Sequence, residues 1–189
     1  IRLGVETILK IICEKIIIKD IKIVNKDDKF SGIIDELYIK AESIIFNKIN
    51  ISNINIKIKD VVLKFAYNKI FSIDNCDAEI YMRLSIDNIN KTLLNNKWKI
   101  LKTKIESFIL NSFQSIEFNN KSIHFITSDG ISIKNNSYTL QNDKNNIFLL
   151  NNINKESISI LDDKNIIIRN LFFFENYIEI ELTSKIIFT

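Results

Sequence analysis

The residues that could carry out chemistry are few and far apart in this 189-residue chain. The one histidine, His124, alternates with Ile123 and Phe125 in a β-like run, so we expect it to point away from the core. Acid–base catalysis near neutral pH most often uses histidine, or a carboxylate or lysine whose pKa is strongly shifted. The sequence therefore predicts a protein that is not an enzyme and that has no catalytic residues.

The same inventory argues against metal and cofactor sites. Two cysteines, Cys13 and Cys76, lie far apart, and with a single histidine they do not give the spacing of a zinc site. Glycine occurs only at positions 4, 32 and 130, which excludes a glycine-rich phosphate loop. We expect no metal and no cofactor, and we expect two buried free thiols, with a disulfide as the alternative.

Most carboxylates fall in polar turns, for example Asp27–Asp28 and Asp162–Asp163. Solvated turn residues of this kind are far more common than calcium ligands or glycosidase acids. Asp35 differs because it is the only charged residue within the apolar face of Ile33, Leu37 and Ile39. We expect Asp35 to lie at the rim of a sheet or to pair with a nearby lysine.

Composition limits the class of partner. The net charge is +3, and the basic residues are interspersed with acidic ones, so we predict no nucleic-acid partner. No apolar run of about 20 residues is present, which predicts no transmembrane span. Isoleucine, asparagine and lysine are abundant, a bias typical of AT-rich genomes such as those of plastids or of streamlined bacteria. The chain begins at Ile1, so we expect an upstream segment, with any targeting signal in it.

The elements that would position a site are organised around Ser31–Phe65. Apolar and polar residues alternate along this stretch, with Ile33, Leu37, Ile39, Ala41 and Ile45 on one face. The alternation then changes phase twice, near Ser52–Asn53 and near Lys59–Asp60. Because the side-chain period of a strand is two, each change requires a bulge or break. The pattern predicts two long, curved antiparallel strands, with a hairpin of ordinary strands as the alternative.

The rest of the chain alternates between helical and β-like periodicity. Residues 3–15 are an expected amphipathic helix, residues 16–24 and 77–84 are expected strands, and Ser85 is an expected helix N-cap within a central helical region over 85–113. A break is expected at Asn95–Asn96. From Ser115 onward we expect an antiparallel meander of short runs: SIEF, SIHFITS, ISIK, NIFLL, SISIL, NIIIRNLFFF and YIEIEL.

One late run places aromatic residues on both faces of an expected strand. It consists of Leu171, Phe172, Phe173 and Phe174. One face can enter a core, and the other requires a second apolar partner, which makes the run a candidate interaction surface. The alternative is a core strand that is covered on both faces.

The order of these elements resembles that of the LmeA-like phospholipid-binding family, a domain of cyanobacteria and actinobacteria with a tubular lipid-binding (TULIP-like) fold. The resemblance is carried by Gly32, Ile33, Asp35 and Leu37, by Ala41, Ser43, Ile44 and Ile45, by Leu84, Ser85, Ile89 and Asn90, and by the closing strands within 165–185. It implies an α+β fold, a single domain over 1–189, in which a long, curved antiparallel sheet wraps around one or two helices. Residues 127–165 are polar and β-like where many members have a second long helix, so a shallower groove is expected.

Two functions follow as hypotheses. The first is a non-enzymatic lipid-binding or lipid-transfer domain, whose groove would hold a phospholipid or another acyl lipid between sheet and helix. Its expected lining is Val61, Leu63, Phe65, Ile86, Ile89, Leu93, Trp98 and Phe108, and closed core is the alternative for each. The second is an accessory subunit of a membrane-associated protein complex. The expected location is a plastid or cyanobacterial cell, peripheral to a membrane such as the thylakoid.

Overall fold

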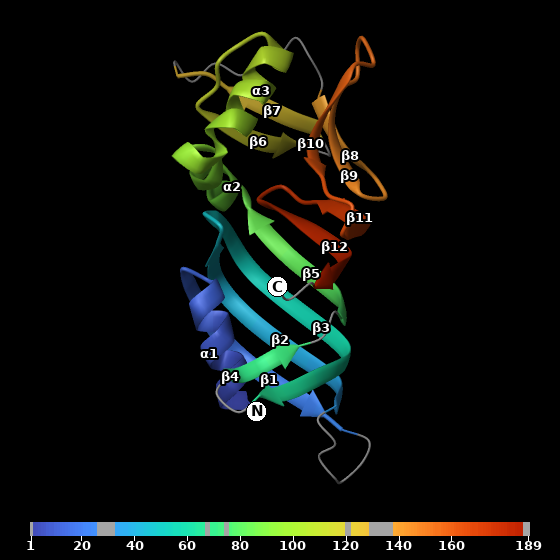
Figure 1. Cartoon of the computed structure of the whole chain (residues 1–189). Coiled ribbons are helices and arrows are strands. Elements are labelled where there is room, and N and C mark those ends of the chain that lie inside the picture. The colour runs from blue at the N-terminus through green and yellow to red at the C-terminus, as the bar shows by residue number, and fades with distance from the viewer. Residues whose placement is uncertain are drawn as a thin grey trace.

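The chain forms two antiparallel sheets and a few short helices (Figure 1). The structure is a computed structural model, and it describes residues 2–25, 33–66, 69–73, 76–119, 122–128 and 138–186. The long sheet contains β1 (Lys15–Val24), β2 (Ile33–Phe46), β3 (Ile49–Ala66), β4 (Lys69–Ile73), β5 (Cys76–Ser85), β11 (Ile166–Phe173) and β12 (Tyr177–Ile186). The short sheet contains β6 (Ser115–Asn119), β7 (Ser122–Ile126), β8 (Tyr138–Asp143), β9 (Asn146–Asn151) and β10 (Ser157–Asp162). The helices are α1 (Arg2–Ile12), α2 (Ile86–Leu93), the single 3-10 turn η1 (Asn96–Trp98) and α3 (Lys99–Ile109).

This composition confirms the predicted α+β class. The strand order of the long sheet is β1-β2-β3-β5-β12-β11, with β4 paired to β3 alone, and that of the short sheet is β10-β9-β8-β7-β6. The short sheet is thus the expected meander. The prediction of one meander up to the C-terminus is wrong for β11 and β12, which join the long sheet. β12 pairs with β5 along its whole length and sets Ile178 beside Leu84 and Leu182 beside Ile80, so apolar residues meet on one face.

The two long strands predicted within Ser31–Phe65 are confirmed as β2 and β3, which are antiparallel. β3 is continuous and keeps a constant register with β2, so the predicted bulges or interruptions are wrong, but both predicted changes of face are present. Ile58 and Val61 are buried although their spacing is odd, because the two residues between them point away and Asp60 has a left-handed φ of 51°. Ile51 and Ile54 likewise both face the core side across Ser52–Asn53. The alternation in the sequence therefore located both changes of face.

β2 changes face at the same two levels, which the alternation did not reveal. Ile34 and Leu37 are both buried, and so are Ala41 and Ile44, with Ser43 at a left-handed φ of 51°. Because both strands change face together, Ile34 still pairs with Val61 and Ile44 with Ile51. The expected buried face is corrected accordingly, since Ile44 rather than Ile45 is buried and the side chain of Ile33 lies outside the described part.

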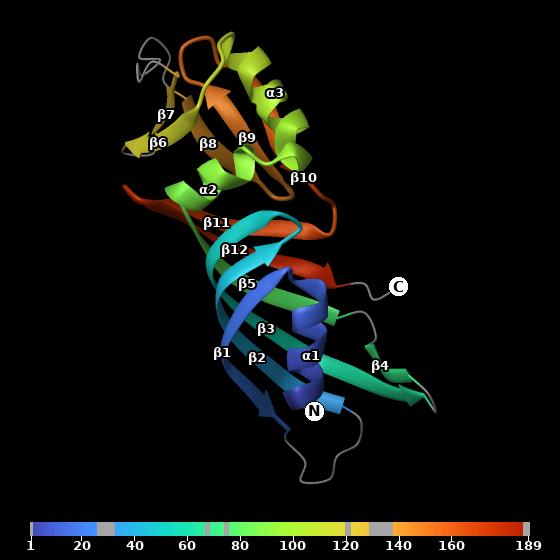
Figure 2. The same ribbon diagram turned by 90° about the vertical axis from the view of Figure 1, so that its left-hand side faces the viewer.

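The apolar face of the long sheet is covered in two halves (Figures 1 and 2). Over β1, β2 and β3 it is covered by α1, through a cluster that joins Val5 to buried strand residues such as Leu37 and Val61. Over β5, β12 and β11 it packs against the short sheet, α2 and α3, in a cluster that runs from Leu93 to Leu182. A third small cluster of Ala41, Ile44 and Ile51 lies at the end of the β2–β3 pair.

The predicted helices are confirmed with adjusted bounds. The first ends at Ile12, three residues before the expected end, and β1 begins at Lys15. The predicted central helical region is divided into α2, η1 and α3. Ser85 is the N-cap of α2, since its Oγ accepts a hydrogen bond from the Asn88 N–H at 3.3 Å, and Asn95 caps η1 in the same manner. α2 contacts β3 and β5 of the long sheet and β6 of the short sheet, so it lies between the two sheets.

Among the helices that the structure describes, none has the length and apolar character needed to cross a bilayer.

Candidate functional site

The half of the long sheet that α1 covers presents a continuous apolar surface. Eight of its strand residues are buried with Val5 in one cluster: Ile21, Ile34, Leu37, Ile39, Ile58, Val61, Cys76 and Ala78. Residues from β1, β2, β3 and β5 contribute, and Ile34 and Ala78 are fully buried. We call this surface the α1-covered face.

Two of the described side chains of α1 belong to this cluster. Among its described side chains only Val5 is buried, and Leu9 packs partly against the strands. Its other side is also apolar in places, because Leu3 is 79% exposed and Ile11 is 77% exposed. α1 is therefore an amphipathic helix. Its described side chains include one buried residue, Val5, and three exposed apolar residues, because Ile12 is 49% exposed as well.

The expected lipid-binding residues do not gather in one groove. Val61 lies in the α1-covered face, whereas Ile86, Ile89, Leu93 and Phe108 belong to the cluster between the two sheets. The side chains of Leu63 and Phe65 lie outside the described part of the chain. The sequence pattern identified these residues as apolar, but it could not show that the sheet divides them between two clusters.

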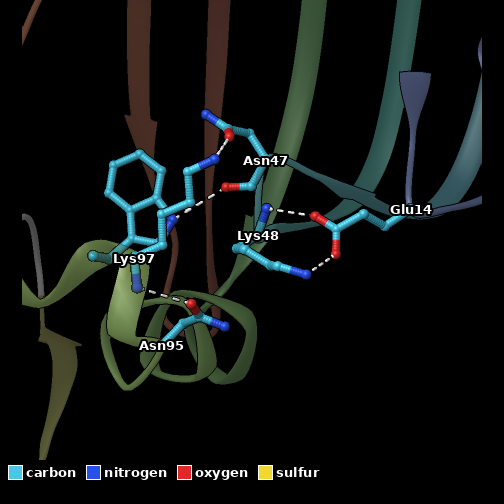
Figure 3. A network of polar contacts seen from close by, with 6 residues as sticks. Glu14, Asn47, Lys48, Asn95 and Lys97 are labelled. Atoms are coloured by element: carbon cyan, nitrogen blue, oxygen red, sulfur yellow. Dashed lines mark hydrogen bonds and ion pairs between the residues drawn. The ribbon is translucent and has the colours of Figure 1, made fainter.

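Trp98 lies apart from both clusters, in a polar network that Figure 3 shows. Its indole Nε1–H donates to the backbone carbonyl of Asn47 at 3.3 Å, and the Lys97 ammonium donates to the Asn47 side-chain oxygen. Asn47 and Lys48 form the β2–β3 turn, and both have left-handed φ angles, of 52° and 66°. The network thus ties η1 to the tip of the β2–β3 pair.

The same turn is tied to the end of α1. The Lys48 backbone N–H donates to Glu14 Oε1 at 3.0 Å, and the Lys48 ammonium forms an ion pair with the same carboxylate. These interactions with Lys48 lower the pKa of Glu14. Glu14 N–H also donates to the Ile45 carbonyl at 2.8 Å. The residues that follow α1 are therefore anchored to the β2–β3 pair by polar contacts.

The candidate interaction surface divides between core and solvent. Leu171 and Phe173 pack against the core, whereas Phe172 and Phe174 are 43% and 41% exposed. The Phe174 ring stacks on Tyr177 at 4.5 Å between centroids, and the Arg83 guanidinium lies 4.4 Å from the Tyr177 ring centroid. β11 thus presents aromatic side chains on both faces, as its sequence predicts.

The opposite face of the long sheet is polar and carries ion pairs between neighbouring strands. Lys57 pairs with Glu36 at 2.8 Å and lies 4.9 Å from the Tyr38 ring centroid. Its hydrogen bonds with Glu36 and then with Tyr38 raise the pKa of Lys57. Arg83 pairs with Glu179 at 2.6 Å. A hydrogen bond from Tyr81 and then the bonds from Arg83 lower the pKa of Glu179. This face was visible in the sequence only as the polar phase of the alternation.

The residues considered for catalysis stay apart. His124 is partly exposed on β7 opposite Glu117, and Asp35 is half-buried at the point where β2 changes face. Cys13 and Cys76 are free thiols, and burial raises the pKa of both. Within the described ranges, no three His, Cys, Asp or Glu side chains are grouped so that they could hold a metal ion.

No family model, no curated protein and no solved structure matches this chain. The resemblance to the LmeA-like family therefore rests on the sequence pattern alone.

Proposed function

We propose that this chain is a lipid-binding module that holds an acyl chain on the α1-covered face, with α1 as a movable cover. One observation carries the proposal: α1 covers eight buried strand residues with Val5 as its only buried side chain among those described. Among the side chains described, displacing α1 breaks the contacts of Val5 and Leu9, and it opens a wide apolar surface.

The energetics favour an acyl chain as the replacement for α1. Each methylene group that leaves water contributes about 0.8 kcal/mol, so an ordinary fatty-acyl chain offsets the loss of the contacts of Val5 and Leu9. Leu3 and Ile11, exposed on the outer side of α1, provide apolar contacts for the helix at a lipid surface once it has moved. The ties of Glu14 to Lys48 and Ile45 keep the C-terminal end of α1 beside the sheet during this movement.

Two alanines of the long sheet provide a matched test. Ala78 is fully buried in the α1-covered face, and Ala41 is 1% exposed in the separate cluster at the end of the β2–β3 pair. Leucine at either position overfills a packed cluster at a similar cost of about 1–3 kcal/mol. Only Ala78→Leu, however, occupies the proposed acyl site.

The measurement is titration with a fluorescent fatty acid, together with mass spectrometry of an organic extract of natively purified protein. We expect lipid in the extract, at least tenfold weaker fatty-acid binding by Ala78→Leu, and unchanged binding by Ala41→Leu. An extract without lipid and a wild-type chain that does not bind the fatty acid would contradict the proposal. Equal loss in both variants would place the binding elsewhere.

A second candidate function is the accessory subunit of a membrane-associated complex. It is favoured by Ile167, Phe172 and Phe174, which are 51%, 43% and 41% exposed on and beside β11, a strand at the edge of the long sheet. Size-exclusion chromatography with light scattering separates the two functions. A monomer that carries lipid supports the module, and an aggregate that disperses only with another protein supports the subunit.

A further inference from the structure

The polar face of the long sheet contains a hollow of about 740 Å³. Its lining includes Asp20 and Lys22 of β1 and Arg169 of β11, which are the strands at the two ends of the strand order. The hollow therefore extends across the polar face from one edge strand to the other. A volume of this size is typical of small-molecule sites, which span roughly 300–1,000 Å³.

The strand register arranges the lining in two rows that cross the sheet. Each residue of a row pairs with its neighbour on the adjacent strand. The first row is Lys22, Tyr38, Lys57 and Glu79, and the second is Asp20, Lys40, Asn55, Tyr81 and Glu181. Four apolar residues of the lining, Ile39, Ile56, Ile80 and Leu182, direct their side chains to the opposite face, so they contribute backbone to the floor.

Some of these side chains are already engaged. Lys57 pairs with Glu36 at 2.8 Å, Glu79 with Lys59 at 3.1 Å, and Glu181 accepts a hydrogen bond from Asn170 at 2.5 Å. These contacts hold the walls in a defined geometry before any ligand arrives, which reduces the entropy cost of binding.

The side chains of five other lining residues make no hydrogen bond or ion pair within the described part of the chain: Asp20, Lys22, Lys40, Asn55 and Arg169. All five are exposed. Lys22, Lys40 and Arg169 carry three positive charges, and Asp20 and Glu181 carry two negative charges. The excess of one positive charge suits a ligand with a single anionic group. Asp20, Asn55 and Glu181 supply acceptors for hydroxyl groups.

We propose that this hollow binds a small hydroxylated ligand with one oxyanion group, a phosphate or a carboxylate, as in a sugar phosphate or a sugar acid. The cations of β1, β2 and β11 bind the oxyanion, and the carboxylates and the amide bind the hydroxyls. The two rows contain no aliphatic side chain, and their apolar surface comes from the rings of Tyr38 and Tyr81, on which a sugar ring can stack. A polyanion is disfavoured because Asp20, Glu79 and Glu181 repeat along the same rows.

A second hollow of about 560 Å³ extends the site on the side of Arg169. It shares Lys57, Glu79 and Arg169 with the first hollow and adds Lys164 and Lys185. A ligand longer than one sugar ring therefore has room beyond Arg169. The site lies on the face opposite the proposed acyl site, so the two proposals stand or fall separately.

The test is isothermal titration calorimetry of the whole chain with glucose 6-phosphate, glucuronate, inorganic phosphate and glucose. We expect both sugar anions to bind, and glucose 6-phosphate to bind more tightly than either phosphate or glucose. Arg169→Gln and Lys40→Gln should each weaken this binding about tenfold or more, since each removes a hydrogen bond to a charged group. Lys10→Gln, which removes an exposed cation from α1, should leave it within twofold. Thermal unfolding confirms that each variant is folded.

Vesicles of phosphatidylglycerol, with phosphatidylcholine as control, identify the source of the oxyanion. Arg169-dependent binding to phosphatidylglycerol alone assigns it to a lipid headgroup, and binding of the soluble sugars assigns it to a free ligand. Either result supports the proposal. Glucose binding as tightly as glucose 6-phosphate, an equal loss in Lys10→Gln, or no binding of any of these probes at millimolar concentration would overturn it.

Discussion

Glu179 is the most shielded carboxylate among the ion pairs of the described residues, with a side chain that is 13% exposed. Tyr81 and Arg83, which come from β5, both bond to it. Arg83 in turn lies over Tyr177, which stacks on Phe174. Single polar residues at this end of the sheet thus act as one group that links β5, β12 and the end of β11.

Removing the charge of Glu179 should lower the free energy of unfolding by an amount that depends on pH. Because the folded state lowers the pKa of Glu179, its carboxylate stabilises the fold above its unfolded pKa of about 4.3, and this contribution is lost as the pH falls. We expect Glu179→Gln to cost about 1 kcal/mol at pH 6. The difference from wild type should shrink below pH 4.

Urea unfolding at pH 6 and pH 3.5 measures this difference. Glu175→Gln is the control, since Glu175 is exposed in the β11–β12 turn and has no ion pair within the described part. A cost that is the same at both pH values would contradict the role given to Glu179.

At the scale of elements, the paired changes of face in β2 and β3 decide how the long sheet curves. Each strand has two consecutive outward residues at the same level, so both strands bend together and their register stays constant. Asp60 and Ser43 make these bends with left-handed backbone angles. This conformation is sterically unfavourable for residues other than glycine, and it is most unfavourable for β-branched residues.

The effect of a substitution at Asp60 should therefore depend on how readily the new residue adopts a positive φ. Asp60→Val should destabilise the fold by about 1–2 kcal/mol, because valine resists a positive φ. Asp60→Gly should be neutral or slightly stabilising, because glycine adopts this conformation without steric cost. Chemical denaturation of the two variants gives the comparison. Equal effects of valine and glycine would show that the Asp60 side chain, rather than its backbone angle, matters.

At the scale of the whole molecule, one apolar sheet face has two very different covers. The short sheet, α2 and α3 cover one half with many buried side chains, and α1 covers the other with Val5 and Leu9 among its described side chains. The two covers should therefore differ in how easily they open.

Val5→Asp should detach α1 from the sheet, since it places a charge in an apolar cluster. We expect a several-fold rise in the fluorescence of 8-anilinonaphthalene-1-sulfonate, which reports exposed apolar surface, with retained far-ultraviolet circular dichroism. Leu3→Asp is the matched control, because Leu3 lies on the same helix and is 79% exposed. A loss of all secondary structure in Val5→Asp would show that α1 does not open independently.

The sequence by itself determined the elements with strong periodicity. The alternation of Val61 with Ile58 located a change of face, Ser85 identified a helix start, and Phe172 and Phe173 were separated to opposite faces. These features are local, because they depend on residues a few positions apart. β4 and β8 were missed, since the runs that form them mix polar and apolar residues without a clean period.

Only the tertiary structure decided which surfaces meet. Nothing near Tyr177 in the chain reveals that β12 pairs with β5, about a hundred residues earlier. That pairing places Ile180 beside Met82, divides the expected lipid lining between two clusters and brings Arg169 to the same hollow as Asp20. An alternating strand can pair with any other alternating strand, so the choice of partner depends on the packing of the whole sheet and its covers.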